Sequence, residues 1–273
     1  MIKLNGYIVE QGRFPDGTLA LNVDVKKLAF NFENCITWLY DNDSELFTIM
    51  SLVDILKRTN RLAKCTLHVP YLPNARMDRI KSNDENFSLK VFANWLNGLE
   101  FDRVIVENVH SNVSNALINN INDRLPDMDI KDIVKKYYFD VIFFPDEGAC
   151  KRYKDMEAIK ELELPIAVGI KNRDWKTGEI LGLDVMGADV KDKNVLIIDD
   201  ICSKGFTFYY SGQKLKELGA KDIRLYITHC EDNIQNGEIL KTDVISKVYT
   251  TDTICHIKDK KIEFVRKFRE NKK

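Results

Sequence analysis

The chain has 273 residues, with 41 lysines and arginines against 42 aspartates and glutamates and a formal net charge of −1. This near balance gives no electrostatic reason to expect nucleic acid or an anionic membrane as a partner, and no apolar run approaches the roughly 18 residues of a membrane-spanning helix. The six cysteines form no CxxC pair and the amino terminus lacks a long apolar core, so a cytoplasmic protein with small-molecule partners is expected.

Strand-like and helix-like segments alternate along the chain, which predicts an α/β fold with mostly parallel sheets. The length suits one large or two modest domains, since a domain typically takes about 100–200 residues. The polar stretch 122–136, which contains Pro126, is the expected junction between domains 1–126 and 127–273. Strands are expected at 64–70, 103–107, 141–145, 166–170, 195–199 and 223–228, and helices at 87–97, 114–122, 151–161 and 208–218.

Two segments of the first half stand out. GRFPDGT, at 12–18, carries a Pro-Asp-Gly sequence that by itself is an ordinary turn signal. HVPYLPNARMDRI, at 68–80, follows a predicted strand and places Arg76 and Arg79 three residues apart. Guanidinium groups match phosphate oxygens in pairs, so a pyrophosphate or triphosphate is the expected ligand. Either arginine alone would be explained more simply by a surface ion pair.

Polar side chains also follow three later predicted strands. His110, in VIVENVHS, and Asp146, in FFPDEGACKRY, each come after an apolar run. Lys171 and Arg173 alternate at the end of another strand, so both side chains are expected on one face. A lone histidine after a strand is more often structural, so His110 gains a functional role only from its context.

The most informative segment is NVLIIDDICSKGFT, at 194–207. Its apolar run predicts a strand buried on both faces, and Asp199 and Asp200 should then lie at the carboxyl end of a parallel strand, where open α/β sheets bind ligands. The turn that precedes the next helix should direct backbone N–H groups at an anion. Carboxylates beside an anion site suit a sugar phosphate. The turn residues are Ser203, Lys204, Gly205, Phe206 and Thr207.

Together these segments resemble the ribose-phosphate pyrophosphokinase family over nearly the whole chain. The strand, acid pair and turn resemble the phosphoribosyl-diphosphate loop that this family shares with type I phosphoribosyltransferases. The resemblance implies two tandem phosphoribosyltransferase-like domains. It also implies an enzyme that moves the β,γ-diphosphoryl group of ATP onto the anomeric hydroxyl of a 5-phosphorylated ribose and leaves AMP. The segment that only the pyrophosphokinases carry is matched by Pro70, Tyr71, Ala75, Arg76, Asp78 and Arg79.

The resemblance also assigns roles to individual residues. It implies that the Phe14 turn receives the adenine of ATP bound to a neighbouring subunit, and hence a homo-oligomer that is at least a dimer. It implies Mg²⁺ as the cofactor, held by His110 and Asp146, and a transition state stabilised by Lys171 and Arg173. The implied ATP-binding residues are Phe14, Asp16, Arg76, Asp78, Arg79 and His110. The implied ribose-phosphate-binding residues are Asp199, Asp200, Ser203, Lys204, Gly205, Phe206 and Thr207.

Four positions depart from the family pattern. Lys204 stands where the family usually has Thr, Phe206 where it has a small residue, Met77 where it has Gln, and Asn108 where it generally has Asp. Lys204 and Phe206 add a charge and an aromatic face to a loop otherwise built for a terminal phosphate. Such a loop could accept ADP-ribose, which is a ribose 5-phosphate with AMP attached. The chain resembles bacteriophage relatives in this respect, which makes ADP-ribose a candidate acceptor in NAD salvage. Ribose 5-phosphate is the family default, and both acceptors stay open.

Two other classes of protein also stay open. A phosphoribosyltransferase would use the acid pair and turn equally well, but it would leave Arg76 and Arg79 unexplained. A non-catalytic regulatory homologue of the synthetase is the binding-module alternative. Four residues that are present argue against it, namely Lys171, Arg173, His110 and Asp146.

Overall fold

The computed structural model describes residues 1–28, 31–173 and 180–270. These residues form two compact units, Met1–Arg124 together with the segment from Phe268 onward, and Leu125–Lys267. The C-terminal segment belongs to the first unit because Lys3, which is 5% exposed, donates hydrogen bonds to the main-chain oxygens of Phe268 and Glu270 at 2.9 and 2.7 Å. The expected division into 1–126 and 127–273 does not anticipate this return of the chain.

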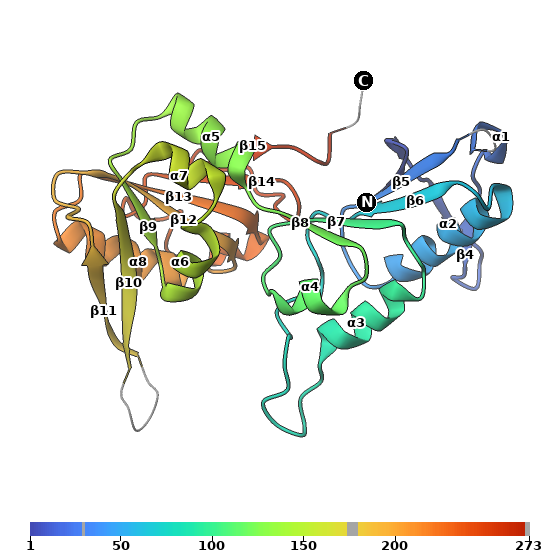
Figure 1. Ribbon diagram of the computed structural model, residues 1–273, viewed down its shortest axis with the longest axis horizontal. Coiled ribbons are helices and arrows are strands. Elements are labelled where there is room, and N and C mark those ends of the chain that lie inside the picture. The colour runs from blue at the N-terminus through green and yellow to red at the C-terminus, as the bar shows by residue number, and fades with distance from the viewer. Residues whose placement is uncertain (29–30, 174–179, 271–273) are drawn as a thin grey trace. The chain divides into compact units, whose positions relative to one another are not determined.

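The sheet of the first unit consists of β1 (Ile2–Leu4), β2 (Tyr7–Ile8), β5 (Glu33–Trp38), β6 (Lys64–His68), β7 (Arg103–Glu107) and β8 (Ile121–Arg124). Their order is β2-β1-β5-β6-β7-β8 (Figure 1). The strands from β5 to β8 are parallel, whereas β1 pairs antiparallel with β2 and β5. A small separate sheet of β3 (Gln11–Arg13) and β4 (Leu19–Leu21), followed by α1 (Val25–Leu28), precedes β5.

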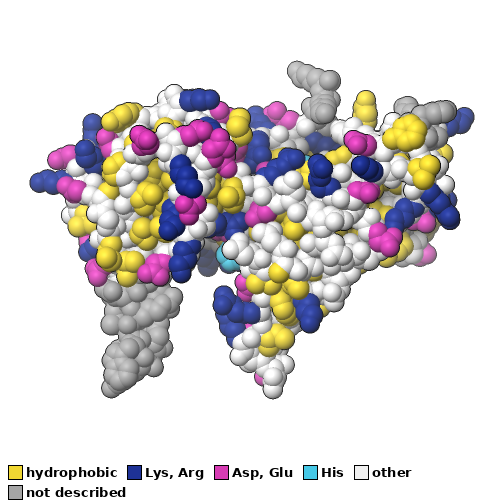
Figure 2. Space-filling model, in the orientation of Figure 1, with side chains coloured by type: hydrophobic (Ala, Val, Ile, Leu, Met, Phe, Trp, Pro, Cys, Tyr) yellow, Lys and Arg dark blue, Asp and Glu magenta, His cyan; other side chains and the backbone are white. Residues whose placement is uncertain are grey.

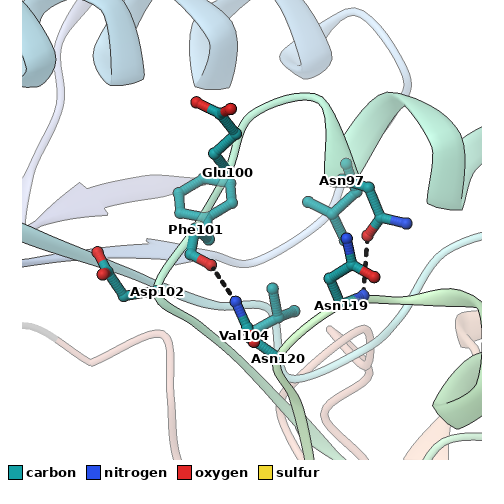
Figure 3. A pocket seen from close by; sticks show the side chains of 8 residues that line it. Asn97, Glu100, Phe101, Asp102, Val104, Asn119 and Asn120 are labelled. Atoms are coloured by element: carbon teal, nitrogen blue, oxygen red, sulfur yellow. Dashed lines mark hydrogen bonds between the residues drawn. The ribbon is translucent and has the colours of Figure 1, made fainter.

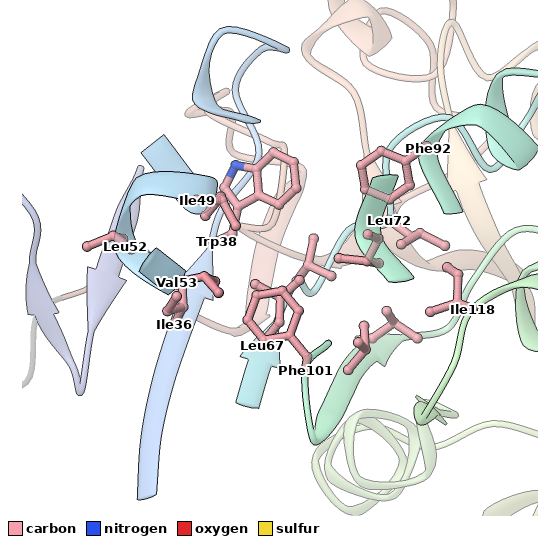
Figure 4. Packing of buried hydrophobic residues seen from close by; sticks show 14 of the residues in the cluster. Ile36, Trp38, Ile49, Leu52, Val53, Leu67, Leu72, Phe92, Phe101 and Ile118 are labelled. Carbon is pink, nitrogen blue, oxygen red and sulfur yellow. The ribbon is translucent and has the colours of Figure 1, made fainter. Parts of the chain in front are cut away.

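Helices α2 (Glu45–Thr59), α3 (Ser88–Asn97) and α4 (Val113–Leu117) connect the parallel strands in turn. Helix α2 buries Ile49, Leu52, Val53 and Leu56, whose spacing of three, four and seven residues makes one apolar stripe. Figure 4 shows residues of this stripe packed beside Trp38 of β5. The core of the first unit therefore lies between the sheet and its connecting helices.

The second unit contains a seven-stranded sheet with the order β11-β10-β9-β12-β13-β14-β15. All neighbours are parallel except β10 and β11, which form a long antiparallel hairpin that projects from the sheet (Figure 1). The strands are β9 (Val141–Phe144), β10 (Ile166–Arg173), β11 (Ile180–Gly187), β12 (Asn194–Cys202), β13 (Asp222–Cys230), β14 (Lys247–Thr251) and β15 (Ile262–Arg266). The helices are α5 (Asp127–Lys136), α6 (Glu147–Tyr153), α7 (Glu157–Leu162), α8 (Phe206–Glu217) and the 3₁₀ helix η1 (Asp232–Asn236).

Strand β12 is buried on both faces. Val195 and Ile197 belong to one apolar cluster with Phe208 and Leu215 of α8. Leu196 and Ile198 belong to a second cluster, to which helices α5, α6 and α7 contribute. Alternate side chains thus enter two cores, which explains why the segment is apolar without interruption.

The expected α/β fold with mostly parallel sheets is confirmed, although several elements differ from those expected. The helix expected at 114–122 ends at Leu117 because Ile118 has an extended backbone, and β8 begins at Ile121, after the left-handed Asn120 with φ +54°. The helix expected at 151–161 is split into α6 and α7. The stretch 122–136, expected as a polar junction, contains α5, which buries Ile130 and Ile133.

The surface reflects the balanced charge of the chain. On the face shown in Figure 2, acidic and basic side chains are interspersed over each unit. Within the described ranges, every helix is too short or too polar to cross a membrane.

Candidate functional site

The acid pair lies inside β12 rather than at its last residue. The pairing of β12 with β9 stops at Ile197, whereas its pairing with β13 continues to Cys202. The strand was expected to end at Asp199, but it continues to Cys202 because β13 pairs with this extension. Asp199 and Asp200 still lie beyond the carboxyl end of β9, so the strand carries them past its shorter neighbour.

The two acids of β12 and Asp146 influence one another electrostatically. Asp200 is only 6% exposed, and its backbone N–H donates to Asp199 Oδ1 at 3.0 Å. Burial, reinforced by the charges of Asp200 and Asp146, raises the pKa of Asp199 well above its usual range. Asp146 caps α6, where its side chain accepts from the Ala149 N–H at 3.0 Å. A cation, or hydroxyl groups that donate hydrogen bonds, would relieve this crowding of carboxylates.

The donor chemistry of these carboxylates fits magnesium, which prefers oxygen ligands and retains waters and phosphate oxygens. The described residues contain no ready-made group of three or more His, Cys, Asp or Glu side chains able to hold a metal ion. A magnesium ion here would therefore share its coordination with substrate. A histidine nitrogen such as that of His110 fits this ion less well than the carboxylates do.

The turn after β12 has the geometry of an anion loop. Gly205 adopts a left-handed backbone, φ +79° and ψ +19°, as the N-terminal cap of α8. The conformation favours glycine, and a Cβ at this position would come within 2.3 Å of Ile239 Cδ1, so the Ile239 side chain would have to move. No side chain caps the first turn of α8, which leaves its backbone N–H groups to bind an anion. Lys204, Phe206 and Thr207 are exposed beside it.

An aromatic pair continues from this loop along α8. Phe206 and Tyr210 are 48% and 58% exposed, and their rings stack with centroids 6.4 Å apart and planes at 25°. Phe206 is among the residues predicted from the sequence, whereas Tyr210 is not. The spacing of four residues on a predicted helix was the available signal, since it places two side chains on one face.

Lys171 and Arg173 occupy the end of β10. Their backbones pair with Leu183 and Ile180 of β11, and the register shifts between Asn172 and Arg173. The unmatched residue at this shift, Leu181, belongs to β11, so β10 itself carries no insertion and the common face expected for Lys171 and Arg173 stays a prediction. The side chains of Lys171 and Arg173 lie outside the described part of the structure.

In the first unit, the arginine segment forms the loop that follows β6. Arg76 and Arg79 are exposed, and Arg79 Nε lies 3.2 Å from Asp78 Oδ1. Asp78 Oδ2 accepts from the hydroxyl of Ser111 at 2.7 Å. Ser111 follows His110, which is exposed, so this bond holds the arginine loop against the loop after β7. Ser111 could not be predicted from the sequence, because its contact with Asp78 joins residues far apart in the chain.

The departure at Asn108 has a structural reading. Asn108 is fully buried and has a left-handed backbone with φ +51°, a conformation that asparagine tolerates better than most residues. Its N–H donates to the Arg124 oxygen at 2.8 Å. A buried neutral amide at this position avoids the cost of burying a carboxylate.

The Phe14 turn is the tip of the β3–β4 hairpin. Asp16 Oδ1 accepts from the backbone N–H and the hydroxyl of Thr18 at 3.0 and 2.7 Å, and these bonds lower the pKa of Asp16. Gly17 has φ +85°. The ring of Phe14 is 58% exposed at this ordered tip, where it is available for a contact outside the unit.

A polar cavity of about 230 Å³ lies elsewhere in the first unit, at the amino ends of β7 and β8. Figure 3 shows its lining. There Asn120 Nδ2 donates to the Phe101 oxygen at 3.0 Å and Asn97 Oδ1 accepts from the Asn119 N–H at 2.9 Å. These amides satisfy backbone groups, so the cavity is lined by structural contacts and is separate from the predicted site residues.

Comparison with known proteins points to one family. The model of the phosphoribosyl transferase domain family matches residues 119–260. The ribose-phosphate pyrophosphokinase of Nitrosomonas europaea is 31% identical over 249 residues, which cover 89% of this chain and 77% of the relative. That of Campylobacter jejuni is 29% identical over 248 residues, covering 89% and 78%. The crystal structure of phosphoribosylpyrophosphate synthetase from Mycobacterium smegmatis has a similar fold, with a TM-score of 0.75 at 20% identity, covering 95% of this chain and 86% of that one.

Proposed function

Because the chain belongs to the ribose-phosphate pyrophosphokinase family, we propose that it transfers the β,γ-diphosphoryl group of ATP to the anomeric hydroxyl of a 5-phosphorylated ribose and releases AMP. The observation that carries this proposal is the acid pair of β12 followed directly by the glycine-bent loop at the start of α8. A sugar diol needs acceptors and its phosphate needs donors. This segment supplies both within a few residues.

Within this proposal, Asp199 and Asp200 orient the ribose hydroxyls, and the backbone from Ser203 to Thr207 holds the 5-phosphoryl group. Phosphoryl transfer needs little covalent participation by the protein, so alignment and cations that face the developing charge do most of the work. Lys171 and Arg173 are the proposed cations. Magnesium, held by Asp146 and its neighbouring carboxylates and shared with the phosphates, would neutralise further negative charge.

The proposed ATP side comprises the residues that the first unit presents after β6 and β7. Arg76 and Arg79 are exposed cations suited to phosphate oxygens. Asp78 and Ser111 hold this loop in place, and His110 lies beside Ser111 to face the triphosphate and its metal. The adenine is proposed to lie on the Phe14 and Asp16 turn of another subunit, so the working enzyme is a homo-oligomer. None of the six cysteines, all of which lie in the described residues, forms a disulfide bond, which suits a reducing compartment such as the cytoplasm.

The acceptor is proposed from the surface beside the anion loop. Ribose 5-phosphate needs only the acids and the loop. The exposed Phe206–Tyr210 stack and Lys204 add a flat aromatic face and a charge, which suit a second phosphate and a base beyond it. These features support ADP-ribose as an acceptor alongside ribose 5-phosphate.

The test is AMP formation from ATP and Mg²⁺ with each acceptor supplied separately, in the wild type and in Phe206→Ala and Tyr210→Ala. Stacking of a base on an aromatic side chain is worth about 1–3 kcal/mol, so each variant should lower kcat/KM for ADP-ribose by roughly 5- to 150-fold. The value for ribose 5-phosphate should change little. Equal losses for both acceptors would remove the aromatic pair from acceptor selection. If no AMP forms with either acceptor, a non-catalytic regulatory homologue is favoured. Release of pyrophosphate that depends on a nucleobase would favour a phosphoribosyltransferase.

A further inference from the structure

The anion loop rests on the turn that follows β13. The Glu231 N–H donates to the Cys202 oxygen at 2.8 Å, at the point where β12 ends. A Cβ at Gly237 would come within 1.8 Å of the Lys204 oxygen, so the two backbones touch directly. The segment 231–237, which contains η1, is called the backing turn below.

Two amides of the backing turn lead to the loop. Asn236 Nδ2 donates to Asn233 Oδ1 at 2.9 Å, and Asn233 Nδ2 donates to the Ser203 hydroxyl at 3.0 Å. Because Asn233 Oδ1 is occupied by Asn236, its amide nitrogen is the group that faces Ser203. Both hydrogen bonds therefore run in one direction, from Asn236 to Asn233 and from Asn233 to Ser203.

This direction determines what the Ser203 hydroxyl can do. A hydroxyl carries a single hydrogen and can accept as well as donate. When it accepts from Asn233, its own hydrogen stays available for a group within the loop. An anion there would receive that hydrogen, whereas a hydroxyl turned the other way would present lone pairs to the anion.

The backing turn is itself anchored at the first residue and at the middle of η1. Asp232 accepts from the backbone N–H and the Nδ1 of His256 at 2.6 and 2.9 Å. Ile234 is fully buried in the core below. A firmly held turn can keep Asn233 in one orientation before any ligand arrives.

We propose that Asn233 is a positioning residue that holds the Ser203 hydroxyl as a donor to the 5-phosphoryl group of the acceptor, with Asn236 fixing the orientation of the Asn233 amide. The inference rests on the proposed function, since it assumes that the loop binds this phosphoryl group. It adds two residues behind the anion loop, Asn233 and Asn236, that are not among the residues matched by the family resemblance.

The decisive comparison is Asn233→Asp against Asn233→Ala. A carboxylate at 233 can still bond Ser203, but only by accepting its hydrogen, so the bond is kept and its direction reversed. Alanine removes the bond and leaves the hydroxyl able to rotate toward the ligand. Hydrogen bonds to charged groups are worth about 1.5–3 kcal/mol, so Asn233→Asp should weaken binding by roughly 10- to 150-fold, and Asn233→Ala by only a few-fold.

Binding of ribose 5-phosphate and of inorganic phosphate is measured by calorimetry, and the KM for ATP is measured alongside. Gln235→Glu adds the same charge to the same exposed turn and is the matched control, which should bind within about twofold of wild type because this turn is solvent-screened. Asn236→Asp is the second variant. Its carboxylate should accept from Asn233 Nδ2, turn the amide over, and reproduce the loss seen for Asn233→Asp.

A role limited to tying the loop in place predicts the opposite order, with Asn233→Ala the more damaging variant, and that order would overturn the inference. A loss in Gln235→Glu as large as in Asn233→Asp would overturn it too. In a Ser203→Ala background, both Asn233 variants should have little further effect on phosphate binding. Because calorimetry needs no turnover, wild-type binding without AMP formation would count against the proposed function while leaving this inference testable.

Discussion

Asp199 is half-buried next to other carboxylates, and in the proposed site this arrangement favours ligand binding at the expense of the protein's own stability. Its pKa is raised well above the usual 3.8 by burial and by the charges of Asp200 and Asp146. The folded state therefore favours the protonated form more than the unfolded state does. Such a group makes the protein less stable as the pH rises above its unfolded pKa, because the unfolded chain then ionises more readily.

Asp199→Asn should remove this pH-dependent penalty. In metal-free buffer at pH 7, the variant should have a larger free energy of unfolding than wild type, and the difference should shrink as the pH falls toward 4. Each unit by which the folded pKa is raised corresponds to about 1.4 kcal/mol. Urea unfolding at pH 7 and pH 4.5 measures the difference, while acceptor binding should weaken in the same variant. A variant less stable than wild type at pH 7 would show that the carboxylate is stabilising instead.

Lys171→Ala should lower turnover far more than ATP affinity. A charge-stabilising donor that acts only in the transition state is worth about 3–4 kcal/mol, which corresponds to a loss of roughly 10²- to 10³-fold in kcat. Steady-state kinetics and direct ATP binding separate the two effects, with Lys221→Ala, an exposed lysine of the same unit, as the control. Near-normal turnover would remove Lys171 from the mechanism.

At the scale of the element, β12 and α8 together form the proposed binding element for the acceptor. The strand is fixed by apolar side chains on both faces, and the helix start is fixed by the glycine that bends the chain between them. Substrate contacts can then come from backbone N–H groups, whose positions follow from the fold rather than from flexible side chains.

Gly205→Ala tests this dependence on the bend. A left-handed backbone costs a residue with a Cβ about 1–2 kcal/mol, and the new methyl would also press on Ile239. The melting temperature should fall, and the KM for the acceptor should rise by roughly an order of magnitude as the turn shifts. Adding Ile239→Val removes the obstructing Cδ1, so it should recover the steric part of the loss and leave the conformational part. An unchanged acceptor KM in Gly205→Ala would mean that the loop does not depend on this conformation.

The sequence predicts elements whose evidence is local and misses those that depend on distant partners. Strand β7 matches its expected bounds, and β12 was evident from its uninterrupted apolar run. Strand β11, which pairs with β10, was missed because its sequence shows neither helical spacing nor a continuous apolar run. β1 and β5 were missed because they precede the first segment read as a strand.

The same limit applies to the candidate site. The acid pair of β12 and its glycine turn form one continuous stretch of sequence, and the arginine segment forms another, so both could be identified from the sequence. Ser111 and Asn233 contact site residues about thirty positions away, and Asn236 reaches the loop only through Asn233, so the fold is needed to reveal all three. Roles that depend on side chains, including those of Lys171 and Arg173, stay predictions.

At the scale of the whole molecule, the proposed active site draws on two subunits. The Phe14 turn presents an exposed ring that its own unit does not bury. The proposed catalytic lysine is carried by β10 of the second unit. A shared site requires that a subunit damaged at one position can be complemented by a subunit damaged at the other.

Mixing Phe14→Ala subunits with Lys171→Ala subunits, unfolding them together and reassembling them, tests this sharing. In a dimer assembled at random from equal amounts, about a quarter of all sites would combine an intact Phe14 with an intact Lys171. Assayed at low ATP, where Phe14→Ala is weakest, the mixture should regain about that share of wild-type activity. A mixture no more active than the average of its two components would mean that the adenine contact is made within one subunit.

The most direct test of the central claim is ³¹P NMR of a reaction that contains the purified protein, ATP, Mg²⁺ and the accepted ribose phosphate. Transfer of the intact diphosphoryl group predicts one AMP for each acceptor consumed, and a product that carries a new diphosphate on its anomeric oxygen. Accumulation of ADP, or of free pyrophosphate without a new sugar diphosphate, would contradict the account.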